Sequence, residues 1–160
     1  MDFYFKLKFP GWNVGKSAQI LTEKSKDKSS HACAKYIREA LEAGGISTAG
    51  HPINAKEYHT KNFLLNKNFK LIKTITSYKE ALDQKGVLGD IAVMTSPSGG
   101  DGHICMWNGE QWVSDFKQNR LYPYQSSGND FGIWIYRWNG DEWLAKNSVN
   151  DATLSTLNIS

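Results

Sequence analysis

The stretch from Ser29 to Gly45 reads Ser-Ser-His-Ala-Cys-Ala-Lys-Tyr-Ile-Arg-Glu-Ala-Leu-Glu-Ala-Gly-Gly. Its apolar residues recur at helical spacing, which places on one buried face Cys33, Tyr36, Ile37, Ala40 and Leu41. Ser29 or Ser30 is expected to cap the helix by accepting a hydrogen bond from a free backbone N–H. Gly44-Gly45 supplies the left-handed residue that ends many helices. The stretch therefore predicts one helix with Cys33 in its first turn.

Cys33 is the candidate nucleophile. At the start of a helix, free N–H groups and the helix dipole favour the thiolate form. The alternative is an ordinary buried cysteine in a core helix, because free cysteines are commonly buried. The other cysteine, Cys105, lies on a predicted strand without a helix end, so we expect a structural role. A Cys33–Cys105 disulfide stays open, and it would block the site under oxidising conditions.

The length and composition of the chain argue against several classes of function. A length of 160 residues fits a single domain over residues 1–160. The 19 basic and 16 acidic residues give a net charge of +3, and they alternate without an arginine-rich stripe, which argues against a nucleic-acid partner. No apolar run approaches membrane-spanning length, so no membrane insertion is expected. The sequence has no His/Cys cluster at zinc spacing, so neither a metal nor another cofactor is expected.

The order of the expected elements predicts an α+β fold with N-terminal helices packed on an antiparallel sheet. Residues 1–10 alternate like a strand, further strands are expected at 69–73 and 91–94, and Ser77 is expected to cap a short helix over 77–84. Residues 103–113 and 132–143 share the pattern Trp-Asn-Gly-acid-x-Trp. Because Asn-Gly between β-formers is a strong hairpin signal, both units are predicted to be hairpins. The tail after about residue 147 is expected to be flexible.

His103 is the candidate general base. It follows a glycine-rich run and begins a strand, and an imidazole titrates near neutral pH, so it can take the thiol proton and return it to a leaving amine. A surface histidine is the alternative. Asp115, on the return strand, is the candidate that orients the imidazole. A two-residue turn would put Asp115 on the other face, so the sequence predicts a bulged, odd-length turn around Gly109.

Four motifs carry a family resemblance, in the order Cys, His, acid. They are residues 31–45, Gly89-Asp90-Ile91-Ala92-Val93, residues 102–107 and residues 112–118. With them the chain resembles the NlpC/P60-type cysteine peptidases, papain-like enzymes that cleave peptidoglycan peptides. More narrowly, it resembles the amidase effectors of the bacterial type VI secretion system. The resemblance covers roughly residues 29–125.

The resemblance implies a papain-like fold in which Cys33 attacks an amide carbonyl, His103 moves the proton and Asp115 orients His103. The implied product is a thioester that water hydrolyses, without a cofactor. The favoured bond is the D-alanyl–meso-diaminopimelate cross-link, and the γ-D-glutamyl–diaminopimelate bond is the other choice. Tyr36, Trp107 and Trp112 are candidates to line the substrate groove, although aromatic residues in a sheet more often belong to the core.

The resemblance also implies partners and a route. The partners are a cognate immunity protein, the type VI secretion apparatus and the peptidoglycan peptide. The N-terminus is too short and too charged for a signal peptide. We therefore expect synthesis in the bacterial cytoplasm without a signal peptide, followed by delivery into the periplasm of a target cell.

Two other classes of function stay open at this point. A non-catalytic wall-binding module would use the aromatic side chains of the two Trp-Asn-Gly units. A transferase or deamidase would use the same Cys-His pair on a different acceptor.

Overall fold

A computed structural model describes residues 6–147. The helices are α2 (Val14–Lys24), α3 (Cys33–Ala43), α4 (Glu57–Thr60), α5 (Phe63–Asn66), α6 (Tyr78–Leu82) and α7 (Gly140–Asn147). The strands are β1 (Phe69–Ile75), β2 (Ile91–Met94), β3 (His103–Trp107), β4 (Trp112–Val113) and β5 (Ile133–Trp138). Residues 1–5, half of the predicted opening strand, and the tail after residue 147 lie outside the described residues. Residues 6–10 form no strand beyond an isolated bridge between Phe9 and Trp12, so the prediction is wrong there. Within residues 6–147, no helix has the length and hydropathy needed to cross a membrane.

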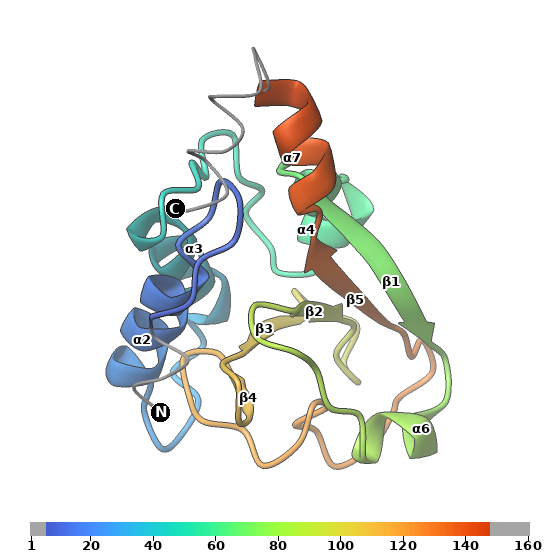
Figure 1. Ribbon diagram of the computed structural model, residues 1–160. Helices are drawn as coiled ribbons and strands as arrows, with labels where there is room; N and C mark the ends of the chain where they lie inside the picture. Colours follow the sequence, from blue (N-terminus) through green and yellow to red (C-terminus); the bar gives the residue numbers. More distant parts are fainter. Residues whose placement is uncertain (1–5, 148–160) are drawn as a thin grey trace.

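The five strands form one antiparallel sheet in the order β1-β5-β2-β3-β4, which confirms the predicted α+β class. Figure 1 shows α2 and α3 side by side next to the sheet, with α6 near its lower edge. Met94 at the end of β2 pairs with both His103 at the start of β3 and Ile133 at the start of β5. Three neighbouring strands therefore begin or end at the same end of the sheet. The loops that lead into and out of these strands lie at that end, next to His103.

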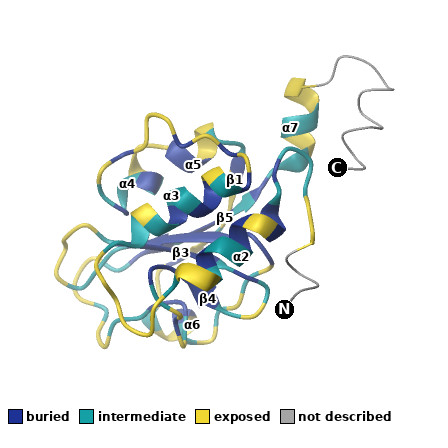
Figure 2. Cartoon of the chain, turned by 90° about the vertical axis from the view of Figure 1, so that its left-hand side faces the viewer, coloured by how far each residue is buried: buried dark blue, intermediate teal, exposed yellow. Residues whose placement is uncertain are grey.

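Alternation along the strands builds an apolar cluster on each face of the sheet. Ile104 and Met106 join the side chains of α2, α3, α4 and α5 in the larger cluster. Cys105 and Trp112 join the opposite cluster, which includes Ala81 of α6 and Leu121 and Tyr122 of the following loop. In Figure 2 the sheet is mostly buried between these two layers. A fully buried serine, Ser17, ties α2 to α3 by donating to the Ala40 carbonyl at 2.6 Å.

Helix α3 confirms the helix predicted from residues 29–45, but it begins later than expected. Its N-cap residue is Ala32, without a capping side chain, so the predicted serine cap is wrong. Cys33 is consequently the first helical residue. The C-terminus is as predicted: Gly45 has φ +94°, its N–H donates to Glu42 O, and the N–H of Ile46 donates to Leu41 O. These two bonds form a Schellman motif, which requires the left-handed conformation at Gly45.

The two Trp-Asn-Gly units adopt different structures. Residues 103–113 form the predicted hairpin of β3 and β4. Gly140, in the second unit, instead begins helix α7, so that hairpin prediction is wrong. Asn139 accepts a hydrogen bond from the Glu142 N–H at 3.1 Å, as an N-cap residue does. Asp141 and Glu142 then lie in the first turn, where the helix dipole favours acidic side chains.

The turn of the first hairpin is not the predicted bulge. Trp107 pairs with Trp112, which leaves an even number of residues between them. The side chain of Asn108 accepts the N–H groups of Glu110 and Gln111, both at 2.9 Å, and this closes a regular turn. Strand β4 ends at Val113, so Asp115 is not paired with β3, and the ring that lies next to His103 is that of Phe116, with centroids 5.9 Å apart. The predicted cap of α6 is also absent, because the Ser77 side chain makes no capping bond.

Candidate active site

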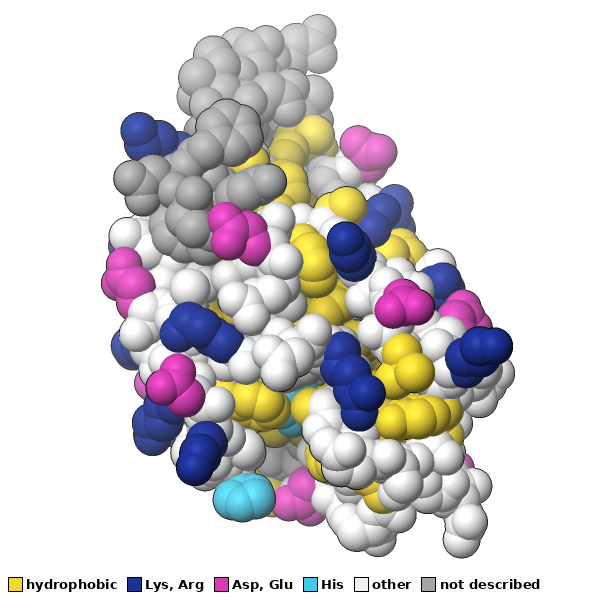
Figure 3. All heavy atoms as spheres, turned by 90° about the horizontal axis from the view of Figure 1, so that it is seen from below, with side chains coloured by type: hydrophobic (Ala, Val, Ile, Leu, Met, Phe, Trp, Pro, Cys, Tyr) yellow, Lys and Arg dark blue, Asp and Glu magenta, His cyan; other side chains and the backbone are white. Residues whose placement is uncertain are grey.

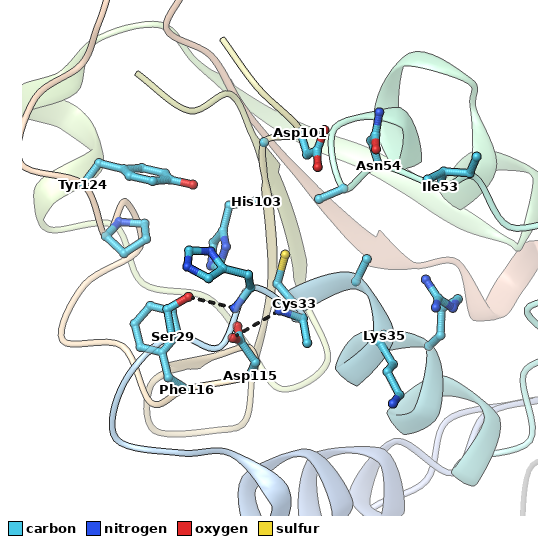
Figure 4. A pocket seen from close by; sticks show the side chains of 17 residues that line it. Ser29, Cys33, Lys35, Ile53, Asn54, Asp101, His103, Asp115, Phe116 and Tyr124 are labelled. Atoms are coloured by element: carbon cyan, nitrogen blue, oxygen red, sulfur yellow. Dashed lines mark hydrogen bonds between the residues drawn. The ribbon is translucent and has the colours of Figure 1, made fainter. Parts of the chain in front are cut away.

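A pocket of about 550 Å³ opens beside the N-terminus of α3, where the sequence places its candidate nucleophile. Its walls are the turn before α3, the loop at residues 53–55, the start of β3 and the loop at residues 115–124. Figure 4 shows the Cys33 thiol and the His103 imidazole close together in this pocket, with the Tyr124 hydroxyl pointing toward them. The structure therefore brings together the two residues that the sequence assigned as nucleophile and base.

Burial of Cys33 favours the thiol over the thiolate. Burial raises the pKa of this thiol, and the Asp115 carboxylate raises it further, while the nearby backbone N–H groups of Ile104 and Ala34 counter only part of the effect. The expected lowering of the pKa by the helix start is thus outweighed by desolvation. As the first residue of α3, Cys33 also presents an N–H that has no partner within the helix.

Gln118 holds the imidazole of His103. The distance between His103 Nε2 and Gln118 Oε1 is 2.7 Å, and both side chains are buried. The Gln118 amide nitrogen donates to the backbone carbonyls of Arg120 at 3.1 Å and Leu121 at 3.0 Å. These two bonds fix the amide so that its oxygen faces the ring, and the proton must then lie on Nε2. Nδ1 of His103 is left as the basic nitrogen.

The electrostatics of His103 favour a neutral ring at rest. Burial lowers the pKa of His103, while the hydrogen bond to Gln118 and the charge of Asp115 raise it by less. A neutral imidazole beside a neutral thiol is suited to act as a general base, because it takes the thiol proton only when the sulfur attacks.

Asp115 does not orient His103 through a hydrogen bond, which corrects the role expected from the sequence. Its Oδ2 accepts the Ser30 N–H at 2.6 Å, the Ser30 hydroxyl at 3.0 Å and the Ala32 N–H at 3.4 Å. These bonds hold the pKa of the carboxyl below its usual range, although burial opposes them. Asp115 is therefore bound to the turn that leads into Cys33.

The turn that Asp115 holds has an uncommon backbone. His31, between Ser30 and Ala32, has φ +61°, in the left-handed region that residues other than glycine seldom adopt. A carboxylate that collects N–H groups from both sides of such a residue stabilises the turn. The functional consequence is that Asp115 sets where Cys33 begins its helix.

Comparison with known proteins identifies the family. No family model and no curated protein matches the chain. Among solved structures, the native type VI effector–immunity complex Tae3–Tai3 from Ralstonia pickettii matches with 30% identity and a TM-score of 0.59, over 77% of this chain and 96% of the other. This chain belongs to the Tae3 family of type VI effectors. The selenomethionine form of that complex matches at 28% identity, also with a TM-score of 0.59, over 76% of this chain and 98% of the other.

Membership in the Tae3 family confirms the type VI effector resemblance seen in the sequence. Gln118 of this family member was assigned no role from the sequence, although an amide in the loop after the base is a known alternative to an acid for holding a histidine. Tyr124, a further aromatic residue that could line the groove, does lie at the pocket. Burial raises its pKa to about 12, so its hydroxyl stays a hydrogen-bond donor.

The three aromatic residues expected to line the substrate groove of this Tae3 family member do not line the pocket. Trp107 and Trp112 pack edge to face at 5.3 Å, and the Trp112 indole donates to the Gln84 carbonyl at 2.9 Å. Tyr36 packs against the larger apolar cluster. The prediction is wrong for these residues because apolar contacts in the core take up their rings. Of the two hairpins on which the wall-binding alternative rested, the second does not form, because Gly140 begins α7.

Cys105 has the structural role expected of it in this Tae3 family member. It is fully buried on β3, it is a free thiol, and burial raises its pKa well above the usual range. Cys33 is also free, so the structure contains no Cys33–Cys105 disulfide. Among residues 6–147, no group of three or more His, Cys, Asp or Glu side chains is placed to hold a metal ion.

Proposed function

We propose that this Tae3 family member is a peptidoglycan amidase that a type VI apparatus delivers into rival bacteria. It would hydrolyse a cell-wall peptide bond through a thioester on Cys33, within a papain-like, NlpC/P60-type catalytic arrangement. One observation carries the proposal: Cys33 begins α3 in the same pocket as His103, whose Nδ1 is left basic by the Gln118 hydrogen bond.

The first step is attack on the scissile carbonyl. His103 Nδ1 takes the proton of the Cys33 thiol as the sulfur forms its bond to the carbonyl carbon. The negative charge that develops on the carbonyl oxygen is stabilised by the Cys33 N–H at the start of the helix. Tyr124 supplies a second donor at the pocket wall, since its hydroxyl stays protonated.

In the second half of the reaction, His103 returns the proton and the product leaves the enzyme. The carbon–nitrogen bond breaks, and the departing amine takes the proton from His103 Nδ1. His103 then accepts a proton from a water molecule that attacks the thioester, and the carboxylic acid product leaves as the Cys33 thiol is restored. Gln118 holds the Nε2 proton throughout, so the same nitrogen acts as base and acid.

The charges of the pocket suit a zwitterionic stem peptide. Lys35 and Arg38 line one wall and Asp101 lines another, so carboxylate and ammonium groups of a substrate each meet an opposite charge. Diaminopimelate carries both groups. The favoured bond is the D-alanyl–meso-diaminopimelate cross-link, and the γ-D-glutamyl–diaminopimelate bond is the alternative within the same proposal.

Charge over the surface also agrees with this substrate class. On the face shown in Figure 3, Lys and Arg side chains are interspersed with Asp and Glu side chains, without a basic stripe for nucleic acid.

A cognate immunity protein that covers the pocket would protect the producing cell. The site of action would be the periplasm of the target cell.

Digestion of cross-linked, diaminopimelate-type peptidoglycan tests the proposal. We expect the wild-type protein to convert cross-linked dimers into tetrapeptide monomers, and Cys33→Ala to leave the muropeptide profile unchanged by mass analysis. Shortened stems would move the cut to the γ-D-glutamyl bond. An unchanged profile with the folded wild-type protein would reject the amidase proposal and favour a transferase or deamidase, which modifies an acceptor without releasing new peptide ends.

A further inference from the structure

A second hollow, of about 250 Å³, lies beside the candidate active site. Its chemistry is mixed: it contains one indole, one phenyl ring, three hydroxyls, one ammonium and one carboxylate. These groups belong to Trp134, Phe131, Thr60, Thr95, Ser96, Lys56 and Asp130. The mechanism above uses none of them.

The two hollows share one thin wall. Ala55 and Asp101 line the active-site pocket, while the adjoining Lys56 and Gly100 line the second hollow. The wall is held together by the Lys56 N–H, which donates to the Asp101 carbonyl at 2.9 Å. It is also tightly packed: a Cβ at Gly102 would lie 2.6 Å from the Met94 carbonyl oxygen and 2.8 Å from Lys56 Cβ. A ligand that crosses this wall reaches both hollows.

The register of the sheet explains why the hollows are neighbours. Met94 pairs with His103 on one side and with Ile133 on the other. Trp134, the next residue of β5, therefore lies near the same end of the sheet as the catalytic base, with only β2 between their strands. A substrate with two parts joined by a short link fits this layout.

Trp134 is held rigidly in place. The His59 ring stacks on its indole with centroids 4.0 Å apart and an interplanar angle of 11°. His59 Nδ1 in turn lies 2.5 Å from the Tyr136 hydroxyl. Because the indole is already ordered, a ligand that packs on it loses little further side-chain entropy.

The lining favours a neutral ligand with both polar groups and an apolar face. The Lys56 ammonium and the Asp130 carboxylate both line the hollow, so a strong anion and a strong cation would each meet a like charge. The Thr95 and Ser96 hydroxyls, although hydrogen-bonded to their own loops, give the lining polar oxygens that a hydrocarbon would not use. A pyranose ring presents hydroxyl and acetamido groups at its edge and C–H groups on its face, which pack on an aromatic ring. The volume lies below the roughly 300–1,000 Å³ of drug-sized sites, so it suits one ring.

We propose that this hollow is a subsite for one sugar ring of the peptidoglycan glycan strand, with Trp134 as its packing platform. The proposal rests on the proposed amidase function, because it assumes that the stem peptide attached to that sugar occupies the pocket of Cys33. The subsite predicts that the enzyme hydrolyses stem peptides attached to glycan in preference to the same peptides without sugars.

Two substrates that differ only in the sugars test the subsite. One is a cross-linked muropeptide dimer with its disaccharides, and the other is the same peptide dimer after the sugars are removed. We expect the wild type to show about a tenfold higher kcat/KM on the glycan-bearing dimer. Trp134→Ala should abolish this preference and leave hydrolysis of the sugar-free dimer unchanged. Trp143→Ala, on α7, is the matched control and should keep the preference.

Equal wild-type kcat/KM on the two dimers would overturn the subsite, even if Trp134→Ala fails to fold. So would an equal loss on both dimers in Trp134→Ala, since that indicates a general structural role. If the wild type cleaves neither dimer, the amidase proposal fails instead. Titration with tri-N-acetylchitotriose, followed by tryptophan fluorescence, then decides the subsite separately: saturable binding that Asp130→Ala and Ser96→Ala weaken supports it, and no binding rejects it.

Discussion

Cys33 and Cys105 are both free thiols whose pKa burial raises, yet their surroundings give them different chemistry. Cys33 begins a helix, lines the pocket and has backbone N–H groups against its sulfur. Cys105 lies in the middle of β3, fully buried in the cluster on the opposite face of the sheet. The comparison teaches that access and a neighbouring base distinguish a nucleophile from a core thiol, more than the pKa of the resting thiol does.

The largest expected difference between the two cysteines is in alkylation. In the native protein we expect iodoacetamide to modify Cys33, and to leave Cys105 protected until the protein unfolds. The rates should differ by at least about a hundredfold, because a fully buried thiol reacts only through opening of the fold. Peptide mass mapping over time measures both rates. Native labelling of Cys105 at the rate of Cys33 would contradict the comparison.

The matched variants separate activity from stability. Cys105→Ala should keep turnover within about twofold and lose about 1 kcal/mol of unfolding free energy, which thermal or urea unfolding measures. Cys33→Ala should keep its stability and lose turnover entirely.

Gln118→Ala tests whether the base of Cys33 depends on its amide partner. We expect turnover to fall by about 10- to 100-fold, since a buried hydrogen bond that fixes the ring is worth about 1–3 kcal/mol. Gln111→Ala is the matched control, because the Gln111 amide donates to the Gln118 backbone carbonyl at 3.1 Å without touching His103. Equal kinetics for Gln118→Ala and the control would remove Gln118 from the site.

Asp115→Asn tests whether the turn before Cys33 is held by a carboxylate. Oδ1 of Asp115 is buried without a hydrogen-bond partner among the described residues. In the asparagine variant an N–H₂ group would take the place of Oδ1 and would have no acceptor there. We therefore expect turnover to fall by about tenfold. Alkylation of Cys33 should nevertheless become faster at fixed pH, because the Asp115 charge that raises the pKa of this thiol is gone. A purely unfolded variant would expose Cys105 as well, which mass mapping detects.

The helix of residues 29–45 and the Cys33–His103 pair were predictable from the sequence, because helical periodicity and a glycine-rich loop before a strand are local signals. The third partner of the site was not. Its identity depends on the turn at Asn108, whose side chain closes an even loop, and on the carbonyls of residues 120 and 121, which orient Gln118. Such contacts are set by the folded loop and not by spacing.

The second Trp-Asn-Gly unit also shows that a short sequence pattern does not determine the local structure. The tripeptide at residues 107–109 connects two strands, whereas the tripeptide at residues 138–140 ends β5 and starts α7. Asn is favoured both in tight turns and at helix N-caps, so the pair Asn-Gly cannot choose between them. The residues that follow decide: Gln111 and Trp112 return to the sheet, while residues 141–147 continue as a helix.

The smallest expected effect is a shift in the pH dependence of kcat/KM. It tests whether Cys33 differs from Cys105 through its neighbouring base or through its charge at rest. Burial lowers the pKa of His103 below its ordinary value of about 6.5, so the ring stays neutral and basic to more acidic pH. Turnover requires that neutral ring, and the acid limb of kcat/KM should therefore lie below pH 6.5. Because the pKa of the Cys33 thiol is raised, ionisation of that thiol should change the rate only above its usual range.

Measurement of kcat/KM between pH 4 and 10 checks both limbs. The Asp115 charge raises the pKa of His103, so Asp115→Asn should move the acid limb further down, whereas Cys105→Ala should leave it in place. A basic limb near neutral pH would instead indicate a resting thiolate–imidazolium pair, in which turnover is lost when the ring loses its proton. In that case Cys33 would differ from Cys105 in its charge at rest, and the general-base step proposed for His103 would be wrong.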